Sequence, residues 1–171
     1  MRQRVLGMAL MATISLLLST ALALNKDDKS AADVLGGNEI VDTILKADKV
    51  EVYRLKDQFF KEKLTEYEAS AGPTELDPKL AKPLAETLVA YNSYERESAK
   101  ACEPIFGVRA TFIRGAVKTD VLFCFQCQIL TVYHQGKRVG GGEFDPVKGK
   151  LEKLVKQIFP KDAAIQKLGM E

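Results

Sequence analysis

The fold is decided by residues 105–144, which read IFGVRATFIRGAVKTDVLFCFQCQILTVYHQGKRVGGGEF. Apolar, aromatic and β-branched residues fill three runs in this stretch, at 105–113, 119–126 and 129–133, and short turns separate them. A glycine-rich strand at 138–144 follows the last turn. Because strands joined by such short connections pair in the antiparallel sense, the stretch predicts an antiparallel β-meander.

Helical patterns flank the predicted meander. The segment 39–47 repeats its apolar residues at helical spacing. Two further helices begin at Asp77-Pro78 and at Asp145-Pro146, where an aspartate can cap the helix and a proline suits its first turn. Strands and helices are segregated along the chain. This pattern indicates the α+β class, with an antiparallel β-meander packed against helices on one face.

Three details of this pattern remain open. Pro83 lies inside the predicted second helix, which either kinks there or begins its regular part there. Residues 50–55 alternate as in a strand, and either Arg54 or Leu55 is the last residue to face inward. Residues 56–75 fit a helix and a strand equally well.

The first 23 residues have the three parts of a secretory signal. Arg2 and Arg4 precede an apolar run from Val5 to Leu18, and small residues follow at the expected cleavage point. This run of about 14 residues is shorter than the roughly 20 that cross a bilayer, so we expect no integral membrane anchor after cleavage. The chain is therefore predicted to be exported to the periplasm or outside a bacterial cell. Its predicted parts are a signal peptide at 1–23, a flexible leader at 24–37 and a single α+β domain at 38–171.

Removal of the predicted signal changes the charge balance. The full chain has 25 Lys and Arg residues against 23 Asp and Glu residues, and the signal holds two arginines and no acidic residue. The mature domain is therefore formally neutral. Nucleic acids and anionic membranes attract proteins through excess positive charge, so we expect neither as the main partner.

Cys102, Cys124 and Cys127 are the main chemical lead. The spacing of the last two is compatible with a redox pair or half of a zinc site. However, a β-prone segment follows them, and they could meet only through a bulge or turn at 125–127. Alternatively, Cys102 pairs with Cys127 or with Cys124 in a structural disulfide, which suits an oxidising compartment. We favour one structural disulfide and one spare thiol over three unpaired buried cysteines, a redox-active pair or a metal site.

The predicted hairpin register adds an arginine to this group. A turn centred near residues 116–117 places Cys127 opposite Phe106 and Cys124 opposite Arg109. Arg109 is a charged residue within an apolar strand, so it could contact an anion or a partner. Solvent-facing alternation of the strand explains it equally well.

The remaining motifs indicate no cofactor and no metal. His134, the only histidine, is predicted in a hairpin turn, and it stands seven residues beyond Cys127, roughly 23 Å along an extended strand. Glycines 140–142 lack the Lys-Ser/Thr of a phosphate loop and predict a bulge or a close backbone approach at the sheet edge. The last helix has a basic side, which we interpret as a solvated face, formed by Lys148, Lys150, Lys153, Lys156 and Lys161.

Two short blocks carry a family resemblance. Residues 102–109 (CEPIFGVR) and 124–127 (CFQC) resemble a group of small exported bacterial proteins with the pattern Cys-x-Pro-x-x-Gly-Val/Ile-Arg followed by Cys-Phe-x-Cys. The group has no established activity, and the likeness covers about residues 50–159. The resemblance implies that the three cysteines belong to one site, together with Arg109, and it implies no mechanism.

These observations lead to two functional hypotheses. The first is an exported, non-enzymatic binding or structural module, held by packing and one disulfide, which binds a protein or a cell-envelope component. The alternative is a thiol-based function, either disulfide exchange or metal capture, centred on Cys102, Cys124 and Cys127. A single histidine and the lack of a nucleophile motif disfavour a hydrolase. The sequence leaves the oligomeric state open.

Overall fold

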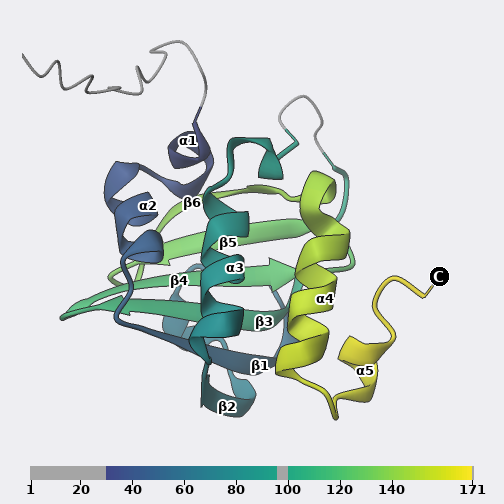
Figure 1. The fold of residues 1–171 in the computed structure, drawn as a ribbon. Coiled ribbons are helices and arrows are strands. Elements are labelled where there is room, and N and C mark those ends of the chain that lie inside the picture. The colour runs from purple at the N-terminus through teal and green to yellow at the C-terminus, as the bar shows by residue number, and fades with distance from the viewer. Residues whose placement is uncertain (1–29, 96–99, 171) are drawn as a thin grey trace, which may run out of the picture.

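A computed structural model describes residues 30–95 and 100–170 of the chain (Figure 1). The predicted signal peptide and the first part of the predicted leader, residues 24–29, lie outside these ranges.

Six antiparallel strands form one sheet, in the order β2-β1-β3-β4-β5-β6. The last four strands follow one another along the chain and form the predicted meander. The pair β1 and β2 precedes them, and β1 lies between β2 and β3. The bounds of the strands are β1 Lys49–Phe59, β2 Ala69–Glu75, β3 Ile105–Arg114, β4 Val117–Cys124, β5 Ile129–His134 and β6 Lys137–Glu143.

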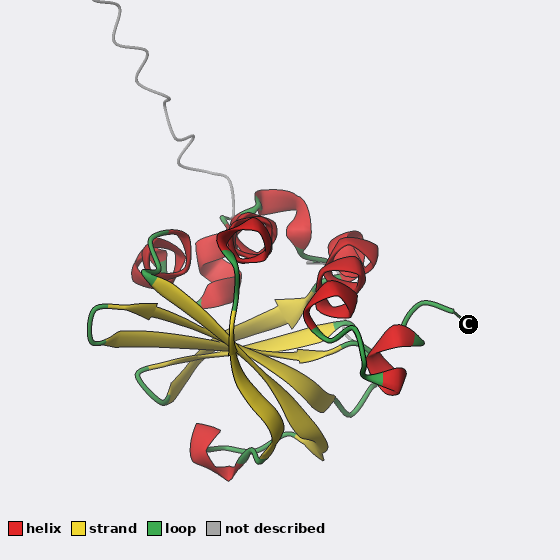
Figure 2. Cartoon of the chain, turned by 60° about the horizontal axis from the view of Figure 1, so that its bottom comes forward, coloured by secondary structure: helices red, strands yellow, loops and turns green. Residues whose placement is uncertain are grey.

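The longer helices cover one face of this sheet (Figures 1 and 2). The prediction of an α+β fold with a β-meander against helices is therefore confirmed. The α-helices are α1 Ala31–Leu35, α2 Asn38–Leu45, α3 Pro78–Val89, α4 Lys148–Ile158 and α5 Ala163–Gln166. Short 3-10 helices are η1 Leu64–Glu66, η2 Tyr91–Ser93 and η3 Asp145–Val147.

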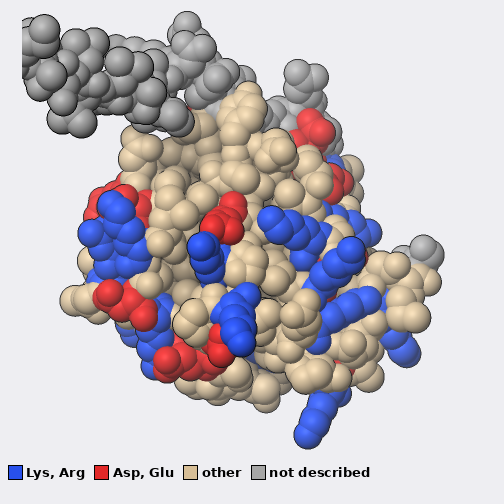
Figure 3. All heavy atoms as spheres, in the orientation of Figure 1, with Lys and Arg blue, Asp and Glu red and all other residues tan. Residues whose placement is uncertain are grey.

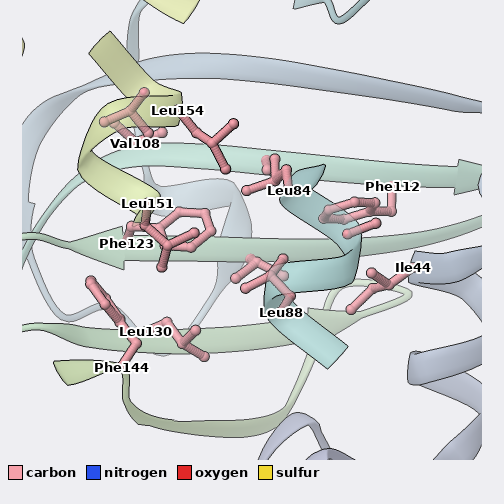
Figure 4. Packing of buried hydrophobic residues seen from close by; sticks show 14 of the residues in the cluster. Ile44, Leu84, Leu88, Val108, Phe112, Phe123, Leu130, Phe144, Leu151 and Leu154 are labelled. Atoms are coloured by element: carbon pink, nitrogen blue, oxygen red, sulfur yellow. The ribbon is translucent and has the colours of Figure 1, made fainter. Parts of the chain in front are cut away.

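The main core lies between the helices and the sheet (Figure 4). Leu84 and Leu88 of α3 and Leu151 of α4 are each at most 2% exposed. They meet aromatic side chains of the sheet, among them Phe112 and Phe123. Burial of one such leucine contributes about 2 kcal/mol, so this layer supplies most of the driving force for folding.

The predicted flexible leader is wrong from Ala31 onward. That segment forms α1, and Leu35 is fully buried against β6. The close approach depends on glycine, because a Cβ on Gly140 would collide with the backbone of Val34 and Leu35. The small residues that suggest flexibility in the sequence instead permit tight packing, so the folded domain includes residues before 38.

The open details of the sequence have clear outcomes. Helix α3 begins at Pro78, with Asp77 accepting a hydrogen bond from the N–H of Lys79, and it continues through Pro83. The segment 56–75 contains the end of β1, the helix η1 and the strand β2. Both Arg54 and Leu55 are buried, because successive residues of a strand face opposite sides of the sheet and both sides are covered at this point.

Candidate functional site

Cys102 and Cys127 form a disulfide, with their Cα atoms 6.0 Å apart. Cys124 is a free, buried thiol. Of the alternatives raised by the sequence, this is one structural disulfide and a spare thiol; a bond between Cys124 and Cys127 is absent. The turn that the sequence required near 125–127 exists, since residues 125–128 join β4 to β5 and Gln128 adopts a positive φ of 55°.

The predicted register of the hairpin is wrong by two residues. Arg109 pairs with Leu122, so Cys124 does not lie opposite Arg109 and Cys127 does not lie opposite Phe106. The two-residue turn between β3 and β4 includes Gly115, whose φ of 57° suits glycine, and this fixes the turn earlier than expected. Because the error is an even number of residues, every side chain keeps its face of the sheet.

The disulfide belongs to a second, smaller core on the sheet face away from the helices. Cys124 is fully buried and Cys127 is 2% exposed. Cys102 and residues of the 60–67 segment pack against this cluster from outside the sheet. Its buried members are Leu55, Tyr67, Phe106, Leu122, Cys124, Cys127 and Tyr133. The cross-link thus fastens the segment before β3 over the apolar residues on the sheet face away from the helices.

Hydrogen bonds hold the same segment to the turn. The Nζ of Lys100 donates to the carbonyl of Cys127 at 2.8 Å and to the carboxylate of Asp145 at 2.5 Å. The side-chain amide of Gln128 donates to the carbonyls of Phe125 at 2.9 Å and Gln126 at 2.8 Å. The disulfide and these hydrogen bonds together hold the segment around residues 100–102 against the turn at 125–128.

The spare thiol lies beside the disulfide. The backbone N–H of Cys127 donates to the Sγ of Cys124 at 3.3 Å. All three cysteines therefore meet at one place, with two in a bond and the third in contact with the backbone of Cys127.

Arg109 lies on the same sheet face as Cys124 but contacts other groups. Its guanidinium stacks 4.0 Å from the ring centroid of Tyr53, and its Nε is 3.8 Å from a carboxylate oxygen of Asp120. Burial raises the pKa of Asp120, which accepts a hydrogen bond from the hydroxyl of Thr111. The carboxylate that Arg109 meets is thus internal, and contact with an external anion or partner stays a prediction.

Sequence reasoning missed the role of Arg54. Its guanidinium donates to the carboxylates of Asp57 at 2.6 Å and Asp162 at 2.9 Å, and to the carbonyls of Leu55 and Gly107. Asp57, followed by Asp162, raises the pKa of Arg54 despite burial. A charged residue at an inward strand position was the available signal, but the partner at 162 is 108 residues away.

Asp162, the acceptor from the C-terminal region, is also the N-cap of a helix. Asp162 caps α5 by accepting hydrogen bonds from the N–H groups of Ala164 and Ile165, each at 3.0 Å. The Ile165 N–H, together with Arg54, holds the pKa of Asp162 below its ordinary value. The cluster around Arg54 therefore joins β1 to the end of the chain.

His134 and glycines 140–142, the other residues singled out from the sequence, contact neighbouring parts of the fold. The Nδ1 of His134 is 2.8 Å from the hydroxyl of Thr119, and its Nε2 is 3.6 Å from a carboxylate oxygen of Glu39. Within residues 30–95 and 100–170, no three His, Cys, Asp or Glu side chains are grouped so as to hold a metal ion. Glycines 140–142 lie at the sheet edge under α1, beside an irregularity in the pairing of β5 and β6, as predicted.

A cleft of about 400 Å³ lies between α2, α3 and the neighbouring ends of β1 and β2. Leu45, half of which is exposed, contributes to its apolar lining. On the rim, Lys49 lies 3.2 Å from Glu75, and Lys82 lies 3.8 Å from Glu86. The charges of this rim therefore largely neutralise one another.

No protein-family model matches the chain, and searches of curated proteins and of solved structures find no significant match. In the described part of the chain, no helix combines the length and apolar character needed to cross a membrane.

Proposed function

We propose that this chain is an exported, non-enzymatic binding or structural module of the bacterial cell envelope. The observation that carries the proposal is the disulfide between the half-buried Cys102 and the buried Cys127, which fastens an irregular segment over the sheet face away from the helices. Disulfides of this kind are typical of proteins outside the cytoplasm, in keeping with the predicted signal peptide.

The surroundings of the sulfurs favour a structural role. Thiol–disulfide exchange requires an attacking thiolate to reach a sulfur atom. Cys127 is 2% exposed, so an external thiol cannot approach its sulfur while the domain is folded, and only the half-buried sulfur of Cys102 is partly accessible. A loop of 25 residues closed in this way is stabilised by about 3.5 kcal/mol through the restricted unfolded chain.

Thiol titration of the mature protein tests this proposal. We expect no reactive thiol in the native oxidised protein, one after denaturation, and three after denaturation with reduction. The one thiol seen after denaturation should map to Cys124. Three reactive cysteines in the oxidised, denatured protein would contradict the proposal.

Export is tested separately. Cell fractionation followed by N-terminal sequencing should find the protein outside the cytoplasm with a new amino terminus near Leu24. A protein that keeps residues 1–23 and remains in the cytoplasm would contradict export.

A thiol-based function is the second candidate, because the sulfur of Cys124 contacts the backbone of Cys127. Here the Cys124 thiolate, after losing its proton to solvent, attacks the sulfur of Cys127. A new bond forms between these two sulfurs, the bond to Cys102 breaks, and Cys102 leaves as a thiolate that takes up a proton. No external oxidant is needed, and the segment around Cys102 is released.

Disulfide mapping distinguishes the two candidates. The protein is incubated at mildly alkaline pH, trapped in acid and digested. A Cys124–Cys127 bond in the wild type favours exchange, whereas only the Cys102–Cys127 bond favours the structural role. The matched control is Cys124→Ala, which cannot exchange and keeps the original bond.

A further inference from the structure

The charges of the mature chain are unevenly distributed although their sum is zero. Between residues 148 and 171 the sequence has six lysines and three acidic residues. Glu152 is buried and lies 3.8 Å from the Nζ of Lys148. Asp162 is bound by Arg54 and caps α5. Glu152 and Asp162 are therefore engaged inside the fold, and the third acidic residue, Glu171, lies outside the described residues.

The other lysines of the segment have no such partners. Within the described residues, no carboxylate lies within 4.0 Å of the ammonium groups of Lys150, Lys153, Lys156, Lys161 and Lys167. We call these five residues the C-terminal basic face. Figure 3 shows Lys and Arg side chains gathered over α4 and the adjoining end of the chain, with few acidic atoms between them.

Helix α4 presents this face because of its own pattern. Leu151, Leu154 and Val155 turn toward the core, so Lys150 and Lys153 are left on the solvent side. This pattern explains a solvated face. A solvated helix face can carry acidic residues as well as lysines. Here the nearby acidic side chains are bound inside the fold, so a local excess of positive charge remains at the surface.

An exposed apolar residue accompanies the lysines. Met170, three residues after Lys167, exposes 75% of its surface. A soluble polyanion gains nothing from a thioether side chain. A lipid surface accepts both groups, because lysines pair with phosphate headgroups while apolar side chains enter the acyl boundary.

We propose that the C-terminal basic face docks the domain on an anionic lipid surface. The inference deepens the proposed envelope function, on which it rests, by naming the partner. This proposal departs from our expectation, based on the neutral net charge, that an anionic membrane is not the main partner. The field of a membrane surface falls off within a Debye length of about 8–10 Å, so the charge of the side facing the lipid matters more than the net charge. The α2–α3 cleft, whose rim charges are paired, offers no comparable attraction.

Vesicle co-sedimentation of the purified, oxidised mature protein tests the docking. The probes are phosphatidylcholine vesicles with and without about one-third phosphatidylglycerol. Each lysine near an anionic surface is worth about fivefold in partitioning. We therefore expect about 100-fold weaker binding to anionic vesicles for the triple variant Lys150→Gln, Lys153→Gln and Lys161→Gln. Raised salt should also weaken the binding of the wild type to these vesicles.

The matched control removes three exposed lysines elsewhere. None of these lysines has an ion pair within the described ranges. Lys63 lies just before η1, and Lys118 and Lys137 lie near the turns at one end of the sheet. The variant with all three changed to Gln has the same net charge as the first variant and should bind as the wild type does.

Three outcomes overturn the docking proposal. They are no preference of the wild type for anionic vesicles, equal losses in both triple variants, and binding to a single-stranded oligonucleotide as tight as binding to the vesicles. The vesicle assay uses purified mature protein and does not depend on where the cell places it, so it can fail while export and the disulfide stand, or succeed where export fails.

Discussion

Removal of the cross-link gives the sharpest test of how this domain is held together. The change is Cys102→Ala with Cys127→Ala, which leaves no new thiol and replaces both sulfurs by small apolar groups. The bond closes a loop of 25 residues, so its loss restores about 3.5 kcal/mol of conformational freedom to the unfolded chain. The bonds from Lys100 to the turn remain in the folded state and do not reduce this cost.

The assay is urea unfolding, compared among oxidised wild type, reduced wild type and the double variant. For a chain of this size the slope is about 1.5–2 kcal/mol per M, so the midpoint should fall by roughly 2 M on reduction. The double variant should not respond to reductant, and it should unfold somewhat below the reduced wild type because it also loses the buried sulfur of Cys127. Cys124→Ala is the control, since loss of its buried sulfur costs about 1–2 kcal/mol but leaves the response to reductant intact.

One result refutes the reasoning. If oxidised and reduced wild type unfold at the same urea concentration, the cross-link does not restrict the unfolded chain, and the second core does not depend on it.

Three further predictions concern the rest of the fold. Arg54→Met should cost about 1–3 kcal/mol in urea unfolding, because it leaves the carbonyls of Leu55 and Gly107 without their donor, while water can still solvate the exposed Asp57 and the half-buried Asp162. Burial raises the pKa of Asp120 in the folded protein above its value in the unfolded chain. The free energy of unfolding should therefore fall as the pH rises above about 4 and Asp120 loses its proton. Asp120→Asn removes this titration, so its stability relative to the wild type should increase over that pH range and stay constant at other pH values. Gly140→Ala should cost about 1–3 kcal/mol by pushing α1 off β6, whereas Gly149→Ala, whose Cβ meets nothing within 4 Å, should stabilise α4 by about 0.5–1 kcal/mol; thermal unfolding of both variants checks the contrast.

The meander and its flanking helices could be predicted because their signals are local. Alternation in 105–133, the capping Asp77 and the apolar stripe of α4 each act over a few residues. The second predicted cap is wrong: Asp145 lies in the 3-10 helix η3 and binds Lys100, and α4 begins at Lys148. The face of each strand is equally local, which is why the hairpin between β3 and β4 kept its faces despite the error of two residues.

The errors arose where distant segments decide the structure. Residues 30–37 look flexible in isolation, and only the glycines of β6, about 100 residues later, allow α1 to pack. The buried position of Arg54 depends on Asp162 at the other end of the domain. The disulfide was correctly among the alternatives, but choosing Cys127 over Cys124 required the turn at 125–128, where Gln128 takes a positive φ.

The two faces of the sheet explain why this fold uses a disulfide at all. Helices cover one face with a continuous apolar layer, and that core requires no covalent support. The other face also carries large apolar residues, including Phe106, Leu122 and Tyr133, which are at most 1% exposed. They are covered by the segments around residues 60–67 and 100–104, which contain little regular structure beyond η1 and few apolar side chains. Such segments lose much conformational entropy for little burial, so a bond that restricts the unfolded chain has its largest effect there. The disulfide that holds these segments is of a kind that forms in oxidising compartments, and this indication of a non-cytoplasmic location does not depend on the predicted signal peptide.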